Sequence, residues 1–259
     1  MYKKNLDFLG FANSFADLSK EILRKKFINT FKIEKKEDGS YVTNIDKEIE
    51  LLFREKVEKT FPDHGVIGEE FGDDKKDNEY TWVIDPLDGT HNFISGKPLF
   101  GTLISCLKNQ RPIIGIVDIP ILNQRWHGGK ELGVMYNNNK CRNLKVNKSY
   151  DELIISSTSL LMFEEKDEKL IRDIYKKARF TIFGSDCYSY GLLILGKIDL
   201  IIEASLKPWD YLAQVSLIEE QGGIITDWKG KDLNLKSDGK IVASLDKNHH
   251  KKTINFLNL

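Results

Sequence analysis

Cysteine is scarce in this chain: three residues, Cys106, Cys141 and Cys187, occur among 259. No two of them have the CxxC spacing of zinc or redox motifs, and their number does not suggest a disulfide framework. Net charge is lacking too, because 39 Lys and Arg residues balance 39 Asp and Glu residues. A nucleic-acid binder needs a basic excess to neutralise phosphates, so the composition argues against that class of protein.

Long hydrophobic runs are missing as well. No stretch approaches the roughly 18 consecutive apolar residues that are typical of a transmembrane helix. The opening segment, MYKKNLDFLGFANSFADLSK, has no long apolar core of the kind found in a signal peptide, and acidic residues interrupt it. We therefore expect a cytoplasmic protein with no membrane partner.

The spacing of apolar residues predicts the first elements. Residues 1–30 read as a helix, whose apolar face carries Phe11, Phe15, Leu18 and Ile22. Residues 31–43 read as a hairpin with Asp38-Gly39 at its turn. A second helix is predicted for residues 45–59, with Asn44 as its N-cap.

The rest of the chain changes character near residue 148. Residues 64–129 are rich in short apolar stretches bounded by Gly, Pro or charged residues, which is typical of strands. Later segments alternate between strand and helix patterns, which indicates a layered α/β protein. We expect an N-terminal α+β lobe, residues 1–147, and a C-terminal α/β lobe, residues 148–259, as one structural unit. The HHKK segment near the end is expected to be a solvated tail.

Acidic residues stand where predicted strands end and helices begin. They are Asp46, Glu69, Glu70, Asp85, Asp88 and Asp210. Read one at a time, they are ordinary caps, turn residues or solvated loop residues. Residues at such places point into a shared crevice, however, and Pro86 and Gly89 allow a sharp bend between Asp85 and Asp88. Carboxylates about 4 Å apart repel by about 4 kcal/mol at an effective dielectric of about 20, so a cluster needs cations. Oxygen ligands suit Mg²⁺ or Mn²⁺ rather than zinc.

Three motifs resemble the inositol monophosphatase superfamily of Mg²⁺-dependent phosphomonoesterases. They are GEE (68–70), WVIDPLDGTHNF (82–93), and PWDYLA (208–213) followed by Gly222-Gly223. They have the order and spacing of that superfamily across nearly the whole chain. Leu212 departs from the pattern, since a small residue is common there. The resemblance implies an α/β fold, a layered α/β/α/β/α sandwich, and a homodimer.

The resemblance also implies roles for individual residues. Glu69, Asp85 and the Leu87 carbonyl are expected to hold one Mg²⁺, and Asp85, Asp88 and Asp210 a second, with a third, weaker ion near Glu69. Glu69 and Thr90 are expected to orient the attacking water, which the metal activates, and Asp46 to accept a hydrogen bond from the Thr90 hydroxyl. Asp88, Gly89, Thr90 and Asp210 are expected to lie against the substrate, with the Gly89 and Thr90 amides on its phosphate.

The resemblance implies a small phosphate monoester as the substrate. Two stretches, FISGKPLFGTLI (93–104) and residues 184–213, resemble the histidinol-phosphate phosphatase branch. Its cationic substrate calls for further acids, for which Asp186 and Glu203 are the candidates. Asp186 also fits a helix N-cap, and Glu203 a solvent-facing strand end. Inositol-1-phosphate or another sugar phosphate stays open as the substrate. A catalytically silent binding protein is disfavoured, because every expected ligand position holds an acid.

Overall fold

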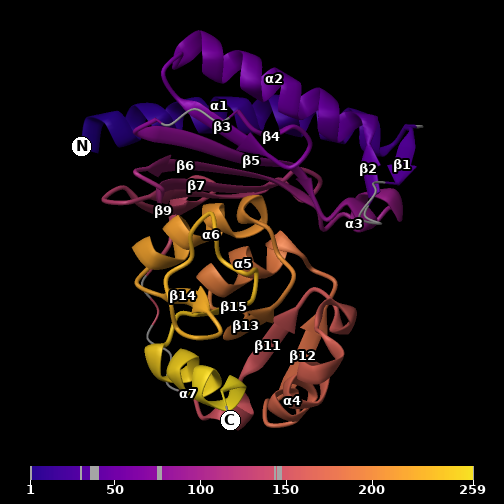
Figure 1. Cartoon of the computed structure of the whole chain (residues 1–259), viewed down its shortest axis with the longest axis vertical. Coiled ribbons are helices and arrows are strands. Elements are labelled where there is room, and N and C mark those ends of the chain that lie inside the picture. The colour runs from indigo at the N-terminus through magenta and orange to yellow at the C-terminus, as the bar shows by residue number, and fades with distance from the viewer. Residues whose placement is uncertain are drawn as a thin grey trace.

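Two long helices near the start lie together on one face of a large sheet (Figure 1). The computed structural model describes residues 2–29, 31–35, 41–74, 78–142, 144 and 148–258. Helix α1 spans Tyr2–Phe27 and α2 spans Asn44–Thr60. Strands β1 (Ile33–Lys35) and β2 (Tyr41–Thr43) pair antiparallel between them, which confirms the predicted strands. The predicted turn, Asp38-Gly39, lies outside the described residues.

The N-cap of α2 differs from the prediction. Thr43, rather than Asn44, caps the helix: its hydroxyl accepts from the Ile45 N–H, and Asp46 accepts from the Thr43 N–H. This reciprocal arrangement is a capping box, in which an acid at the third helical position completes the cap. Asn44 becomes the first helical residue and accepts instead from the Lys32 N–H.

The large sheet has eight strands in the order β10-β9-β8-β7-β6-β5-β3-β4. All neighbours are antiparallel except β3 and β5. The strands are β3 (Gly65–Gly68), β4 (Gly72–Asp73), β5 (Tyr80–Asp88), β6 (Gly101–Lys108), β7 (Arg111–Ile119), β8 (Gln124–Gly129), β9 (Gly133–Tyr136) and β10 (Asn139–Lys140). The short helix α3 (Thr90–Ile94) follows β5 directly.

The smaller sheet has five strands in the order β12-β11-β13-β15-β14. They are β11 (Ile154–Ser157), β12 (Phe180–Phe183), β13 (Leu200–Glu203), β14 (Ile224–Asp227) and β15 (Ile241–Ser244). The helices of this half are α4 (Glu165–Tyr175), α5 (Cys187–Ile194), α6 (Pro208–Glu220) and α7 (Lys247–Leu257), with 3₁₀ turns at Tyr150–Glu152 and Leu160–Met162.

The helices and sheets form five layers (Figure 1). Three hydrophobic clusters pack these layers against one another. One lies between α1, α2 and the large sheet, and a second between the large sheet, α5, α6 and the small sheet. The third lies between the small sheet and α4 and α7. The predicted α/β/α/β/α layering is therefore confirmed. The division into lobes at residues 147 and 148 stays a prediction.

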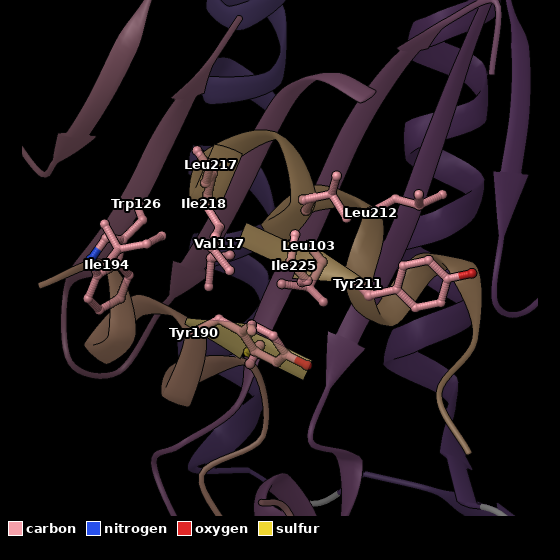
Figure 2. Close-up of a cluster of buried hydrophobic side chains, with 14 of the residues drawn as sticks. Leu103, Val117, Trp126, Tyr190, Ile194, Tyr211, Leu212, Leu217, Ile218 and Ile225 are labelled. Atoms are coloured by element: carbon pink, nitrogen blue, oxygen red, sulfur yellow. The ribbon is translucent and has the colours of Figure 1, made fainter. Parts of the chain in front are cut away.

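Helix α6 fills the middle layer. Residues 211–218 of α6 are all buried, as expected for a helix covered on both sides. Figure 2 shows Leu212, Leu217 and Ile218 of α6 among side chains of both sheets, including Val117 and Ile225. Because α6 begins at Pro208, this packing anchors the segment that carries Asp210.

The C-terminal HHKK segment is not a solvated tail. It lies within α7, where His249 and His250 are buried. His250 pairs with the Thr226 hydroxyl at 2.8 Å, and His249 with the Lys148 carbonyl at 2.9 Å. The third hydrophobic cluster explains the difference, because the small sheet needs α7 to cover its outer face. Among the described helices, none has the length and apolarity needed to cross a membrane.

Candidate metal centre and active site

A bulge in β5 shapes the first part of the site. Asp85 pairs with Leu103 and Asp88 with Gly101, so three steps along β5 match two along β6. Side chains alternate along a strand, and one extra residue reverses the alternation. The bulge therefore lets Asp85 and Asp88 face the same side, as the motif spacing predicted. The Leu87 N–H donates to Asp85 Oδ1 at 2.9 Å, which closes the bend.

The first turn of α6 brings the third carboxylate. Asp210 accepts from the Lys207 N–H at 2.7 Å, so it is held in place by the start of the helix. Asp88 is held from another direction, since the Cys187 N–H at the start of α5 donates to its Oδ2 at 2.8 Å. One carboxylate oxygen from each of Asp85, Asp88 and Asp210 lies within 4.8 Å of the others. The structure thus brings together three of the predicted metal ligands, from two elements 122 residues apart in the sequence (210 − 88).

Burial and mutual repulsion make this cluster unfavourable without a cation. Burial is the largest cause that raises the pKa of Asp85 and Asp210 well above the usual range, and the neighbouring carboxylates raise it further. Burial, together with the charge of Asp186, raises the pKa of Asp88 to about 7. A divalent cation reverses both effects, because it replaces the lost solvation and neutralises the repulsion. Three converging carboxylates, of which Asp85 is buried and Asp88 and Asp210 are partly buried, therefore fit Mg²⁺.

Glu69 lies apart from the three. It follows β3 at the turn toward β4, outside the group within 4.8 Å. Its charge nevertheless raises the pKa of Asp46, Asp85 and Asp210, so it lies on the same side of the site. The role of Glu69 at a different ion from the one held by Asp88 stays a prediction.

The predicted hydrogen bond from Thr90 to Asp46 is wrong. The Thr90 hydroxyl donates instead to the Leu87 carbonyl at 3.0 Å, and Asp46 Oδ2 accepts from the Thr43 N–H and hydroxyl. The capping box accounts for the difference, because it turns Asp46 toward its own helix start. Asp46 Oδ1 is buried and has no hydrogen-bond partner in the structure as described. Burial raises the pKa of Asp46 to about 6.

The turn after β5 has the sharp bend that was expected at Gly89. Gly89 has a φ of 80°, a left-handed conformation that glycine adopts without strain, and it precedes α3. The Leu87 carbonyl, a predicted metal ligand, already accepts from Thr90 on this turn. The phosphate-binding roles of the Gly89 and Thr90 amides stay predictions.

The two candidate substrate acids differ in exposure, since Glu203 is buried and Asp186 is partly buried. Glu203 is 2% exposed, so it is not a solvent-facing strand end. It accepts from the Thr158 N–H at 3.0 Å, the Thr158 hydroxyl at 2.6 Å and the Tyr190 hydroxyl at 2.7 Å. Burial raises its pKa to about 7.

Asp186 stands at the N-cap position of α5, but its side chain makes no capping hydrogen bond within the described part of the chain. It accepts instead from the Asn92 amide. Burial raises the pKa of Asp186 to about 6, against the charges of Lys97 and His91, which lower it. Its own charge raises the pKa of Asp88, so Asp186 adds a negative group at the edge of the cluster.

A cavity of about 700 Å³ lies between the start of β5 and the start of α6. Ile67, Thr81 and Trp209 contribute to its lining, whereas Asp85, Asp88 and Asp210 do not. The carboxylate cluster, rather than the cavity, therefore defines the candidate site.

Several acids near the site share a pH dependence. The folded-state pKa of Asp46 and Asp186 is about 6, and that of Asp88 and Glu203 is about 7. All four lie above the ordinary value of roughly 4 for the unfolded chain. Between about pH 4 and pH 7 these groups bind more protons when folded, so they lower the stability of the metal-free protein as pH rises. Buried histidines act in the opposite sense, since burial lowers the pKa of His250 to about 4.

We therefore expect the stabilisation by Mg²⁺ to grow from pH 5 to pH 7.5. Mg²⁺ must displace protons from the carboxylates, and fewer protons remain at the higher pH. Melting curves with Mg²⁺ and with EDTA at both pH values measure this. The difference in melting temperature between Mg²⁺ and EDTA removes the contribution of the histidines, which is the same in the two solutions at a given pH. A shift that is equal at both values, or larger at pH 5, would contradict the carboxylate site.

Comparison with known proteins agrees with this geometry. The sequence model of the inositol monophosphatase family matches residues 5–258. The chain belongs to the inositol monophosphatase family. Members of this family use Mg²⁺, and the chain has the acidic cluster to bind it.

Individual relatives carry several names. The bifunctional phosphatase IMPL2, chloroplastic, of Arabidopsis thaliana is 40% identical over 242 residues, 92% of this chain and 69% of that protein. A fructose-1,6-bisphosphatase/inositol-1-monophosphatase of Aquifex aeolicus is 32% identical, over 80% of each chain. A histidinol-phosphatase of Mycobacterium tuberculosis is 30% identical, over 86% of this chain and 88% of that protein. The solved structure of an inositol monophosphatase from Zymomonas mobilis superposes with a TM-score of 0.89 at 36% identity, over 98% of each chain.

Proposed function

We propose that this phosphatase hydrolyses histidinol phosphate to histidinol, a step of histidine biosynthesis. The observation that carries the proposal is Asp186, a partly buried acid beside the cluster whose charge raises the pKa of Asp88. Histidinol phosphate has a cationic amine and an imidazole near its phosphate, whereas inositol phosphate has only hydroxyls. A further acid next to the carboxylate cluster favours the cationic substrate.

The chain's own residues would divide the work. Asp85, Asp88 and Asp210 would hold Mg²⁺, with Glu69 and the Leu87 carbonyl at a further ion. Bound Mg²⁺ supplies Lewis-acid polarisation of the phosphate and lowers the pKa of water. Glu69 and Thr90 would orient the attacking water, with Asp46 beside Glu69. The Gly89 and Thr90 amides would bind the phosphate oxygens, and Asp186 and Glu203 the rest of the substrate.

Inositol-1-phosphate, or another sugar phosphate, is the second candidate. Two observations favour it: Asp186 already pairs with Asn92 near Lys97, and the matched Zymomonas mobilis structure is of an inositol monophosphatase. Glu203 is likewise engaged, by Thr158 and Tyr190. A catalytically silent binding protein is disfavoured, since all the predicted ligand positions hold acids.

We expect Asp186→Ala to lower kcat/KM for histidinol phosphate at least tenfold, and to change inositol-1-phosphate hydrolysis little. A charge-assisted hydrogen bond is worth roughly 1.5–3 kcal/mol, which corresponds to about a tenfold to hundredfold change. Phosphate release with Mg²⁺, from both esters and both proteins, measures the difference. Equal losses on the two esters, or faster wild-type turnover of inositol-1-phosphate, would contradict the proposed substrate and leave the phosphatase class standing.

We also propose a cytoplasmic homodimer, as the family resemblance implies. Light scattering on the purified protein would give twice the 29.8 kDa mass of one chain. A mass of one chain at micromolar concentration would contradict the dimer.

A further inference from the structure

A charged stripe on α2 faces the turn that carries Glu69. Asp46, Glu50 and Arg54 follow one another at intervals of four, so they lie on one side of the helix. Glu50 is fully buried at 0% exposure, although a lone buried carboxylate is costly. Sequence reasoning missed it, because nothing but its spacing from Asp46 distinguishes it from the exposed acids of α2.

The Glu50 carboxylate accepts hydrogen bonds from the backbone that follows Glu69 and lies close to the backbone that precedes it. It accepts from the Glu70 N–H at 2.7 Å and from the Phe71 N–H at 3.1 Å. On the other side of Glu69, a Cβ on Gly68 would lie 2.2 Å from Glu50 Oε1, so only glycine admits the carboxylate there. The carboxylate is therefore enclosed by the backbone of residues 68–71.

Arg54 completes this arrangement. Its guanidinium donates to Glu50 Oε1 at 2.8 and 2.9 Å, and also to the Val66 carbonyl in β3 and the Gly72 carbonyl in β4. Glu50 thus has its charge neutralised and its oxygens occupied, so it is not free to bind a metal ion itself. Its contacts instead tie α2 to both strands that flank the turn.

We propose that Glu50 is a positioning residue that sets the place of the Glu69 carboxylate in the metal centre. Asp85, Asp88 and Asp210 converge through β5 and α6, whereas Glu69 comes from the β3–β4 turn. The buried Glu50 carboxylate holds the backbone after Glu69 by two hydrogen bonds and lies against Gly68 before it. The inference rests on the proposed Mg²⁺-dependent phosphatase function.

The test is Glu50→Gln, which keeps the shape but turns one acceptor oxygen into a donor that cannot receive the Glu70 N–H. We expect kcat to fall at least tenfold, the Mg²⁺ concentration for half-maximal rate to rise at least tenfold, and KM at saturating Mg²⁺ to change less than threefold. The rise in melting temperature on adding Mg²⁺, measured without substrate, should shrink. Glu50→Asp keeps the charge but draws it back by one methylene, and it should show the same changes if Glu50→Gln does not fold.

Asp199→Asn is the matched control. Asp199 is also a buried carboxylate that accepts from a backbone N–H, of Ile154, and from a cation, Lys148. Asp199 lies next to β13 of the five-stranded sheet, away from the metal centre. Loss of its charge should therefore lower the melting temperature, while the rate and the Mg²⁺ dependence stay as in the wild type.

A double-mutant cycle with Glu69→Gln separates positioning from general support. If Glu50 acts through Glu69, adding Glu50→Gln to Glu69→Gln should lower kcat less than threefold further. A full tenfold loss in that background, or wild-type Mg²⁺ dependence in Glu50→Gln, would overturn the proposal. Wild-type protein that hydrolyses no phosphate ester with Mg²⁺ would instead refute the proposed function, and the substrate-free Mg²⁺ melting shift would still test Glu50.

Discussion

Asp88→Asn is expected to lower the turnover of phosphate esters by about 10³-fold while the protein remains folded. Stabilisation of a phosphoryl oxygen by a bound metal ion is worth several kcal/mol, and each 1.36 kcal/mol is about tenfold in rate. The amide has the same shape and can still accept from the Cys187 N–H, as Asp88 does at 2.8 Å. What is lost is one negative ligand among three carboxylates.

The same substitution should lower activity but raise the stability of the metal-free protein. Removing one of the three converging carboxylates relieves their repulsion, so metal-free Asp88→Asn should melt higher than the metal-free wild type at pH 7.5. Asp199→Asn is the control, because it loses a buried charge that is paired with Lys148 at 2.6 Å; it should melt lower and stay active. Wild-type turnover in Asp88→Asn, or a lowered melting temperature in EDTA, would refute the ligand assignment.

Removal of divalent metal is expected to abolish activity completely. EDTA should reduce phosphate release to background, and added Mg²⁺ should restore it, with Mn²⁺ as a substitute. At Mg²⁺ about 100 times its dissociation constant, binding stabilises the folded state by about 2.7 kcal/mol. For a chain of this size that is a rise in melting temperature of roughly 5–10 °C.

Two measurements check this expectation together. Rate and melting temperature are followed in one Mg²⁺ titration of chelated protein, and both should rise over the same concentration range. Asp88→Asn provides the control, since its melting temperature should respond much less. Full turnover in exhaustively chelated protein would show that the carboxylates do not act through a metal ion.

Much of the fold could be predicted because its signals are local. The apolar spacing of residues 11–22 and the alternation after residue 148 correspond to α1 and to the strands and helices of the second half. The three acidic motifs likewise support the metal-binding prediction, because carboxylates that cluster at strand ends and helix starts need a cation such as Mg²⁺. The sequence also contains the signal for the true cap of α2, because Thr43 and Asp46 have the spacing of a capping box.

Contacts between distant segments were beyond local patterns. The predicted hydrogen bond between the distant residues Thr90 and Asp46 does not form, and His250 is buried against Thr226 rather than solvated. Glu50 looks like any acid on an amphipathic helix until the β3–β4 turn is placed against it.

The sequence by itself determined which residues can bind a metal ion and which segments form helices and strands, because both depend on residue type and short spacing. Only the tertiary structure decided which carboxylates converge and which are occupied. The bulge in β5 and the burial of α6 bring Asp85, Asp88 and Asp210 together, whereas Glu50 and Glu203 bind amides and hydroxyls of other elements. A carboxylate's partners depend on the donors that packing brings to it, and packing joins residues more than a hundred positions apart.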